Sequence, residues 1–400
     1  WAWAAPAMAQ DKAGVERQFQ SWLEQTVWPR ARAKGVSRST FERAFDGVSL
    51  NWSLPELVPP GSSATPKGQK QAEFGAPARY FRPARLEADA GVGKRMAQRH
   101  AKALAMAEAA TGVPGRIILG VWGRESGYGQ VPIRHNAFEV LGTKGFMSTR
   151  TELFTQELIA ALQIVERGLA PRGTLRSSWA GALGQPQFLP TSYLKYARDG
   201  NGDGRADIWG SEADTIASIA TYLARHGWVP GRDWGFEVRV PRDVSCTLEG
   251  PDQARRISDW AAMGITRFSG RPFPEHEARA QGFLLMPAGR YGPAFIATPN
   301  FLALKEYNTS DLYALFVGHV GDRIQYNMKG FRGEWRSVGK LTRGEIAAMQ
   351  AALERMGHDV GGVDGLPGFK TRRSIGRWQE ATGRSPTCFP DRGVIDALAR

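Results

Sequence analysis

The sequence predicts a mainly α-helical protein of the α+β class, in which a small α+β region is inserted into a helical body. Apolar side chains recur at helical spacing through most of residues 92–226. Between about 229 and 306 the pattern changes to prolines, glycines and short alternating stretches such as 236–240, which indicate strands and loops. After Lys340 a new apolar pattern begins with its own glycines. A compact C-terminal module of about sixty residues is therefore expected.

The predicted elements follow in order along the chain. Residues 14–48 have apolar positions at helical spacing, and Ser37 is expected to cap a second short helix that ends at Phe45. Prolines and glycines between 51 and 70 predict a linker. Further helices are expected at 92–111, 115–126, 151–168, 190–198, 212–226 and 307–328. The expected domains are an N-terminal helical segment with its linker at 10–70, a main domain at 71–335 that contains the insertion at 229–306, and the module at 340–400.

The composition indicates a globular protein with an anionic partner. The 400 residues are 42% hydrophobic and 23% charged, which is ordinary for a soluble chain. No uninterrupted apolar run reaches the roughly 18 residues that a membrane span needs. The formal net charge of +13 favours a nucleic acid, an anionic cell wall or a membrane surface as partner. Because the basic residues are spread along the chain without a dense block, nucleic acid ranks last.

The first residues look like the end of a secretory signal. Ala7-Met8-Ala9 fits the small-x-small cleavage pattern, so residues 1–9 are expected to be a signal-peptide remnant and Gln10 the first mature residue. A frayed chain end is the alternative. The two cysteines, Cys246 and Cys388, lie far apart in the sequence. They could pair in an oxidising compartment, but the expectation is two free thiols in separate domains.

Glu125 is the most informative single residue of the chain. It follows the apolar run 117–122 and precedes the segment 127–129, which is expected to end the helix and open a concave wall. Burial against Trp122 would disfavour the charged form of the carboxyl group and raise its pKa. A carboxyl group that keeps its proton is the general acid that cleavage of a glycosidic bond needs. An ordinary helix-terminal glutamate paired with a neighbouring arginine is the alternative.

The segment 199–207 matches the start of a calcium-binding loop, in which alternate oxygens point inward and a glycine makes a sharp turn. The predicted ligands are Asp199, Asn201, Asp203, Arg205 through its carbonyl, and Asp214. Gly210 stands where the twelfth-position glutamate is usual, so Asp214 or Glu212 would complete the shell only in a longer loop. A glycine-rich surface turn that binds no metal is the alternative. A structural calcium ion is the one cofactor suggested, and none is required for the chemistry below.

Two further segments have the composition of a ligand groove. Residues 177–190 combine small residues, an aromatic side chain and two glutamines, which suits a groove floor that hydrogen-bonds amides and hydroxyls, although tight packing would use the same residues. Residues 306–313 start a helix with polar and aromatic groups, where Asn308 or Ser310 would by default be the N-cap. No second carboxylate stands in a setting like that of Glu125. Because an ordinary glycosidase uses a pair, this indicates chemistry in which the substrate supplies the second group.

Taken together, these segments resemble the lytic murein transglycosylases of the membrane-bound lytic transglycosylase B type. The E-[ST]-x-[FY]-G motif of that family, which carries its catalytic acid, is matched by Glu125–Gly129. The segment S-[WY]-A-G-A-x-G-x-x-Q-F-x-P-x-S-[YF] is matched by Ser178–Tyr193, and the D-x-x-G-D-G stretch by Asp199–Trp209. The resemblance covers about 71–328 and implies a lysozyme-like catalytic domain. The wording of the family pattern is altered between Val131 and Arg150.

The resemblance also implies roles for individual residues. Glu125 is the expected catalytic acid, and calcium is bound by some members of the family. The residues expected to line the substrate groove are Ser178, Gln187, Tyr222, Tyr307, Asn308, Tyr313 and, with a one-residue slip in the alignment, Tyr80.

The C-terminal tail resembles a peptidoglycan-binding module of the three-helix type. The matching positions are Leu341, Gln350, Leu353, Gly357, Val360, Asp364, Gly365, Gly368, Thr371, Ile375, Trp378 and Gln379. Such modules bind wall peptide or glycan without catalysis. Taken alone, a helical module of this size could be any interaction domain.

The resemblance implies a periplasmic enzyme that cleaves the β-1,4 bond between N-acetylmuramic acid and N-acetylglucosamine without water. Glu125 would act first as acid and then as base, and the product would end in a 1,6-anhydro sugar. The expected partners are peptidoglycan glycan strands and other cell-wall enzymes, with no nucleic acid, and the expected state is a monomer. A hydrolytic lysozyme-like muramidase and a non-catalytic wall-binding scaffold are the alternatives.

Overall fold

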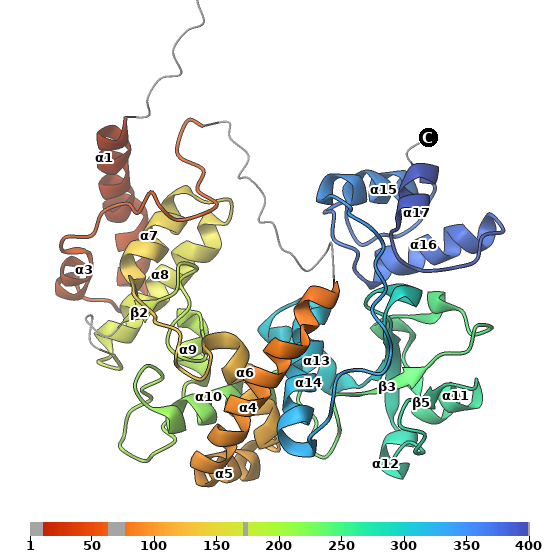
Figure 1. Cartoon of the computed structure of the whole chain (residues 1–400). Coiled ribbons are helices and arrows are strands. Elements are labelled where there is room, and N and C mark those ends of the chain that lie inside the picture. Colours follow the sequence, from red (N-terminus) through yellow and green to blue (C-terminus); the bar gives the residue numbers. More distant parts are fainter. Residues whose placement is uncertain (1–10, 63–76, 171–174, 399–400) are drawn as a thin grey trace, which may run out of the picture. The chain divides into compact units, whose positions relative to one another are not determined.

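The computed structural model describes residues 11–62, 77–170 and 175–398 (Figure 1). The predicted signal-peptide remnant at 1–9 lies outside the described residues. By its internal packing the chain forms two compact units. The first contains residues 11–62 and 122–222, and the second contains residues 77–121 and 223–398. The predicted domain boundaries near residues 70, 335 and 340 stay a prediction.

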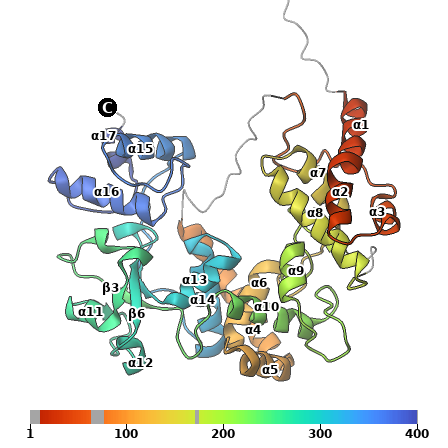
Figure 2. The ribbon, with the colours of Figure 1, turned by 180° about the vertical axis from the view of Figure 1, so that it is seen from behind.

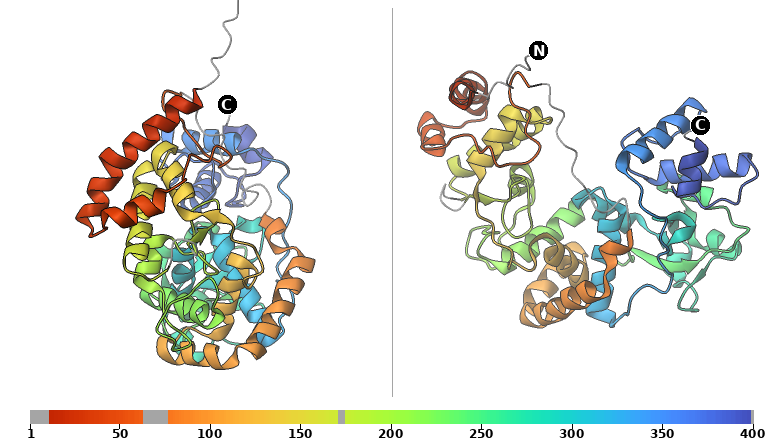
Figure 3. Two further views of the ribbon diagram at one scale, coloured as in Figure 1. Left: turned by 90° about the vertical axis from the view of Figure 1, so that its left-hand side faces the viewer. Right: turned by 45° about the horizontal axis from the view of Figure 1, so that its top comes forward.

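The first unit is built from helices and one short β-ladder. Its helices are α1 (Lys12–Trp22), α2 (Trp28–Ala33), α3 (Arg38–Phe45), α7 (Ala137–Met147), α8 (Thr151–Glu166) and α9 (Pro190–Tyr196), with the end of α6 (Gly115–Ser126) and most of α10 (Glu212–Arg225). A π-helical turn over Leu23–Val27 joins α1 to α2, so that one long helix lies beside α7 and α8 (left view of Figure 3). As predicted, Ser37 caps α3, because its side chain accepts a hydrogen bond from the Thr40 amide.

The core of this unit lies around α7, a helix that the sequence analysis did not expect. Two glycines of α7 face the long N-terminal helix, and they allow a close approach of its aromatic rings. A Cβ atom on Gly142 would lie 3.2 Å from the ring of Phe19, and one on Gly145 would lie 3.0 Å from the ring of Trp22. Glycine therefore serves here as a contact surface, at a modest cost in helix propensity.

The second unit combines helices with a sheet (Figure 2). Its helices are α4 (Pro83–Arg99), α5 (Ala101–Thr111), α11 (Ile257–Ala262), α12 (Glu275–Ala278), α13 (Pro299–Tyr307), α14 (Asp311–Tyr326), α15 (Arg343–Arg355), α16 (Phe369–Ala381) and α17 (Arg392–Leu398). The single helix expected over 92–111 is two helices that meet at His100. The helix expected over 307–328 begins at Asp311, because Ser310 caps it by accepting from the Tyr313 amide.

Strands occur where the alternating pattern predicted them. The strands are β3 (Gly235–Arg239), β4 (Arg255–Arg256), β5 (Thr266–Arg267), β6 (Gln281–Leu285) and β7 (Ala294–Ala297), and they form one antiparallel sheet in the order β4-β6-β7-β3-β5. Phe236 lies opposite Ile296 and Leu284 lies opposite Ile296 on the other side of β7. These apolar residues and Trp260 of α11 share one buried cluster.

The C-terminal helices α15, α16 and α17 have a core of their own, which includes Ile346, Leu353, Ile375 and Trp378. A capping box opens α15, in which the side chains of Thr342 and Glu345 each bond the other residue's backbone N–H. Figure 1 shows these helices, in blue, beside the sheet of the same unit.

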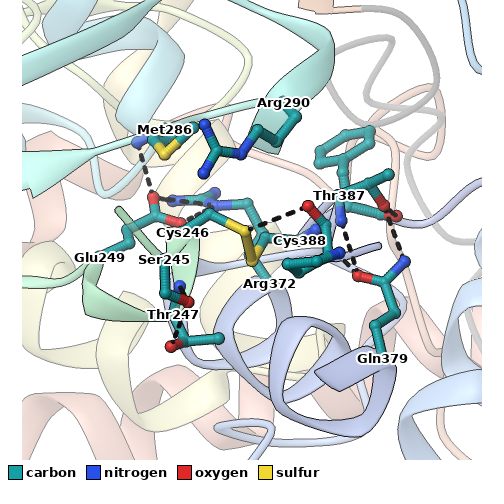
Figure 4. The surroundings of a disulfide bond; sticks show 12 residues. Ser245, Cys246, Thr247, Glu249, Met286, Arg290, Arg372, Gln379, Thr387 and Cys388 are labelled. Carbon is teal, nitrogen blue, oxygen red and sulfur yellow. Dashed lines mark hydrogen bonds and ion pairs between the residues drawn. A yellow bond between two sulfur atoms is a disulfide. The ribbon is translucent and has the colours of Figure 1, made fainter. Parts of the chain in front are cut away.

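A disulfide joins these helices to the sheet region. The expectation of two free thiols is wrong, because Cys246 and Cys388 are bonded with an S–S distance of 2.03 Å (Figure 4). Their separation of 142 residues in the sequence does not reflect their distance in space, since α16 packs against the turn that carries Cys246. Gln379 fixes the other half of the bond by accepting the backbone N–H of both Thr387 and Cys388.

Buried ion pairs accompany the disulfide. Arg372 of α16 bonds Glu249 from the sheet region at 2.5 Å and Asp311 of α14 at 3.0 Å. Glu249 is fully buried and also accepts the Met286 amide. Because a buried carboxylate needs a cation and N–H donors, this network fixes the position of α16 against the sheet.

Among the described residues, no single helix has the length and apolar character needed to cross a membrane, although the bent pair α5 and α6 passes that test when the two are counted together.

Candidate functional site

Glu125 lies in the last turn of α6, half-buried, where three successive residues turn the chain sharply. Gly127, Tyr128 and Gly129 all have positive φ values, of 57°, 59° and 78°. Tyr128 is not a glycine, so this conformation has an energetic cost that the surrounding contacts must offset. The Tyr128 ring packs edge-on to Trp122, and a Cβ atom on Gly123 would lie 2.6 Å from it. The turn after Glu125 is thus fixed by packing.

A buried glutamine supports this turn from the other side. Gln185 accepts a hydrogen bond from Nε1 of Trp122 at 2.9 Å and donates to the carbonyl oxygen of Trp209 at 3.1 Å. A Cβ atom on Gly129 would lie 2.5 Å from Oε1 of Gln185, so only glycine fits there. Gln185 therefore links the end of α6, the loop 178–188 and the segment just before α10. In the sequence Gln185 is one of two glutamines in the segment 177–190, without a sign of these partners.

Ser178 and Gln187 lie in that loop, which two isolated β-bridges at Leu183 hold in shape. The hydroxyl oxygen of Ser178 accepts the backbone N–H of Ala180 and of Ala182, each at 3.3 Å. Gln187 has a φ of 54°, and its Nε2 donates to the carbonyl oxygen of Gly184 at 3.0 Å. Both side chains are half-buried.

These bonds determine what each side chain can offer to a ligand. A hydroxyl has two lone pairs and one hydrogen, so Ser178 with both lone pairs engaged is left as a donor. Gln187, whose amide nitrogen is engaged, is left with its oxygen as an acceptor within the described residues. A donor and an acceptor from one loop are complementary to the C=O and N–H of an acetamido group.

Tyr222 of α10 belongs to the same unit and lies within an aromatic cluster. Its ring packs against Phe188 at 5.4 Å and edge-on to Tyr196 at 5.2 Å, so the cluster connects α10 to the loop 178–188 and to α9. The first unit thus contains Glu125, Ser178, Gln187 and Tyr222 among the predicted site residues.

The second unit contains the other predicted groove residues. Tyr307 ends α13 half-buried, and Asn308 follows it exposed, with its side-chain oxygen accepting the Ser310 amide. Tyr313 of α14 is buried with 2% exposure, so its ring is part of the helix packing. Tyr80 lies in the 3₁₀ turn Pro77–Phe81, edge-on to Phe316 of α14 at 5.5 Å.

The predicted calcium loop is closed on itself by hydrogen bonds. Asp199 accepts the backbone N–H groups of residues 201, 202, 203 and 204, and these bonds hold its pKa below the usual range. Asp214 is fully buried and accepts the amides of Gly200 and Asp207. In the part of the chain that the structure describes, no group of three or more His, Cys, Asp or Glu side chains is arranged to hold a metal ion.

In this arrangement the carboxylates of Asp199 and Asp214 accept amides of the loop backbone. Asn201 and Asp203 are exposed and bonded to each other, and Arg205 donates its amide to Asp203. The calcium site stays a prediction, and no chemical step below depends on it.

Comparison with known proteins shows the family to which the chain belongs. The family model described as the transglycosylase SLT domain matches residues 18–322. Membrane-bound lytic murein transglycosylase B of Escherichia coli strain K12 is 32% identical over 214 residues, which is 53% of this chain and 57% of the relative. The chain thus matches a little over half the length of that curated relative.

Solved structures extend the similarity to nearly the whole chain. SltB3 from Pseudomonas aeruginosa in complex with NAG-NAM-pentapeptide is 34% identical, with a TM-score of 0.83 over 95% of this chain and 99% of that one. The same protein in complex with NAG-anhNAM-pentapeptide gives 33% and 0.82 over 96% and 99%. An E. coli lytic transglycosylase in complex with calcium shares the fold, with 24% identity and a TM-score of 0.55 over 79% and 94%. The predicted lysozyme-like, mainly α fold with a small sheet region is confirmed, and this chain belongs to the transglycosylase SLT domain family.

Proposed function

We propose that this protein is a lytic transglycosylase that cleaves the β-1,4 bond between N-acetylmuramic acid and N-acetylglucosamine in peptidoglycan. The observation that carries the proposal is the position of Glu125, at the end of a buried helix and on a turn that Trp122, Tyr128 and Gln185 hold in place. Precise placement of one acid is what general acid catalysis demands.

In the proposed reaction Glu125 is the only protein group that exchanges a proton with the substrate. It donates its proton to the glycosidic oxygen as the bond from that oxygen to the anomeric carbon of muramic acid breaks. The substrate's own acetamido oxygen stabilises the positive charge that develops at that carbon. The C6 hydroxyl oxygen then bonds to the anomeric carbon and gives its proton to the Glu125 carboxylate. The acid is regenerated, no water is consumed, and the product has a 1,6-anhydro end.

The loop 178–188 suits the acetamido group in this reaction. Ser178 has a hydroxyl hydrogen to donate to the acetamido oxygen, and Gln187 has an amide oxygen to accept from its N–H. Hydrogen bonds to the acetamido oxygen and from its N–H would hold the acetamido group against the anomeric carbon. The group is then in place to stabilise the positive charge that develops there. Tyr222, Tyr307, Asn308, Tyr313 and Tyr80 are the remaining proposed groove residues.

We infer a periplasmic location for the enzyme. The bond between Cys246 and Cys388 supports this, because disulfides persist in oxidising compartments. The net charge of +13 suits an anionic wall polymer. The helices of 340–400 are proposed to bind that polymer without catalysis. The enzyme is expected to act as a monomer among other cell-wall enzymes, and no nucleic acid partner is proposed.

The products of digestion test the proposal. Purified peptidoglycan is incubated with the wild-type protein and with Glu125→Gln, and the muropeptides are identified by mass spectrometry. Anhydro-muropeptides are expected from the wild type alone, with a rate loss of about 10²–10⁴ in the variant. Gln130→Glu, an exposed change in the same turn, is the matched control and should retain activity. Reducing ends from the wild type would mean hydrolysis, and no products at all would mean a binding role.

A further inference from the structure

A pocket lies in the unit that contains the sheet, between strand β3, the end of α14 and the segment 328–332. Its volume is about 780 Å³, which is within the range of sites that hold small molecules. None of the proposed groove residues lines it. The residues that line it include His319, Asp322, Arg267, Arg271, Phe331 and Arg332, and we call it the His319 pocket.

His319 is a buried polar side chain that has no hydrogen-bond partner among the described residues. It lines the pocket from α14 with 0% exposure, and neither Nδ1 nor Nε2 bonds any described residue. Burial, with the nearby charge of Arg323, lowers its pKa to about 3, so the ring is neutral and offers one donor and one acceptor. Buried polar atoms in folded proteins are nearly always hydrogen-bonded, so this ring indicates a partner that is not among the described residues.

The acidic groups of the pocket are already satisfied. Asp322 accepts from Arg116 at 2.6 Å and from Nε1 of Trp234 at 3.0 Å. Asp233 accepts from the same guanidinium at 3.0 Å. Glu237 accepts the amides of Arg332 and Gly333. The hydrogen bonds of these carboxylates are thus made inside the protein, while the charges of Glu237 and Asp233 act on Arg332 and Arg267.

The mouth carries an excess of positive charge. Arg271, Lys329 and Arg332 are exposed, and within the described residues none of their side chains pairs with a carboxylate. Arg267 is half-buried, and desolvation together with the charge of Arg271 lowers its pKa, although Asp233 opposes this. A ligand that carries an anion would relieve this repulsion between neighbouring cations.

The walls between mouth and floor are aromatic. Phe331 packs on the His319 ring with the centroids 4.0 Å apart, and Phe236 lies under the guanidinium of Arg267 at 5.0 Å. Trp234, Phe268 and Phe295 also line the pocket. Aromatic faces beside hydrogen-bonding groups favour a ring that is apolar on its faces and polar at its edge.

We propose that the His319 pocket binds a carboxylated amino sugar, with the carboxylate at the arginines of the mouth and a polar substituent of the ring at His319. Because the proposed function makes peptidoglycan the substrate, the choice of N-acetylmuramic acid as the sugar rests on that function. The pocket would hold a muramic acid residue of the wall polymer at a place other than the bond that is cleaved.

Binding of two matched monosaccharides tests this. The full-length Glu125→Gln protein is titrated by calorimetry with N-acetylmuramic acid and with N-acetylglucosamine, which lacks the lactyl carboxylate. The muramic acid is expected to bind at least about tenfold more tightly, which corresponds to one charge-assisted contact. Arg271→Ala with Arg332→Ala should remove that preference, and His319→Phe should weaken both sugars.

The variants separate the possible outcomes. Arg279→Ala, another exposed arginine of the same region outside the pocket lining, should bind like the parent protein. Should His319→Phe fail to fold, the two surface arginine changes still test the site. Equal affinity for both sugars, unchanged affinity in all pocket variants, or no binding would each overturn the proposal. Wild-type digestion without anhydro products would instead contradict the proposed function, and it leaves the titration result standing.

Discussion

Single hydrogen bonds decide how well the proposed acid is held. Glu125 lies three residues from Trp122, whose indole N–H reaches Gln185, and the same glutamine bonds the Trp209 carbonyl. The sequence predicts Glu125 as the acid, because a carboxylate after an apolar run is unusual. It did not identify Gln185, because a glutamine carries no sign of its partners until the three segments meet in the fold.

Replacement of Gln185 by methionine is expected to weaken catalysis without any contact to substrate. Methionine has a similar volume but removes one acceptor and one donor, and a buried hydrogen-bonding group that loses its partner costs about 1–3 kcal/mol. We expect a lower midpoint of unfolding and a lower kcat with little change in KM, because Gln185 is a positioning residue. Urea unfolding and steady-state digestion measure the two effects.

The exposed Gln130→Met change is the control for this variant. A higher KM at constant kcat would instead place Gln185 among the substrate-binding residues.

At the level of elements, the sequence predicted what periodicity and caps determine. Ser37 and the alternating residues of β3 were correctly identified, since their signals are local. Helix α7 was missed because glycines such as Gly142 and Gly145 have poor helix propensity. They are explained by close contact with aromatic rings more than a hundred residues away in the sequence. Long-range contacts of this kind leave no mark on the segment itself.

The capping box of α15 predicts how the C-terminal helices respond to acid. Hydrogen bonds from Arg392 and Thr342 lower the pKa of Glu345 to about 2, from about 4.5 in the unfolded chain. A lowered folded-state pKa means that the unfolded state binds the proton more readily, so this stabilisation is present above pH 4.5 and is lost as the pH falls towards 2.

Hydrogen exchange of the α15 amides at pH 5 and pH 3 checks this expectation. Protection should fall with pH in the wild type and less so in Glu345→Gln, which has no charge to lose. Identical pH dependence in both proteins would contradict the assignment.

At the scale of the whole molecule, buried charge fixes the C-terminal helices more firmly than surface contacts do. Glu249 is fully buried against Arg372, whereas the neighbouring Arg373 pairs with the half-exposed Asp252. The sequence indicated a module at 340–400, but it could not indicate its attachment, and it was wrong about Cys246 and Cys388. Pairing depends on distance in space, which residues 142 apart do not reveal.

Two adjacent arginines make a matched test of this attachment. Arg372→Met leaves Glu249 buried without its cation and is expected to cost about 3–5 kcal/mol of stability. Arg373→Met loses a pair whose carboxylate, Asp252, is half-exposed, and should therefore cost less. Chemical denaturation of both variants, with the disulfide intact, gives the comparison. Equal losses of stability in the two variants would show that the buried pair contributes no more than the neighbouring pair.

The disulfide also has a consequence for a chain that has been cut. Residues 327–330, after the end of α14, are exposed, and the next helix begins only at Arg343. A protease that cleaves this connecting segment would separate the chain into two polypeptides. Because Cys246 lies before the cut and Cys388 after it, both fragments would remain one covalent particle until a reductant released the smaller one. Limited digestion should therefore yield a single band on a non-reducing gel and two bands after reduction.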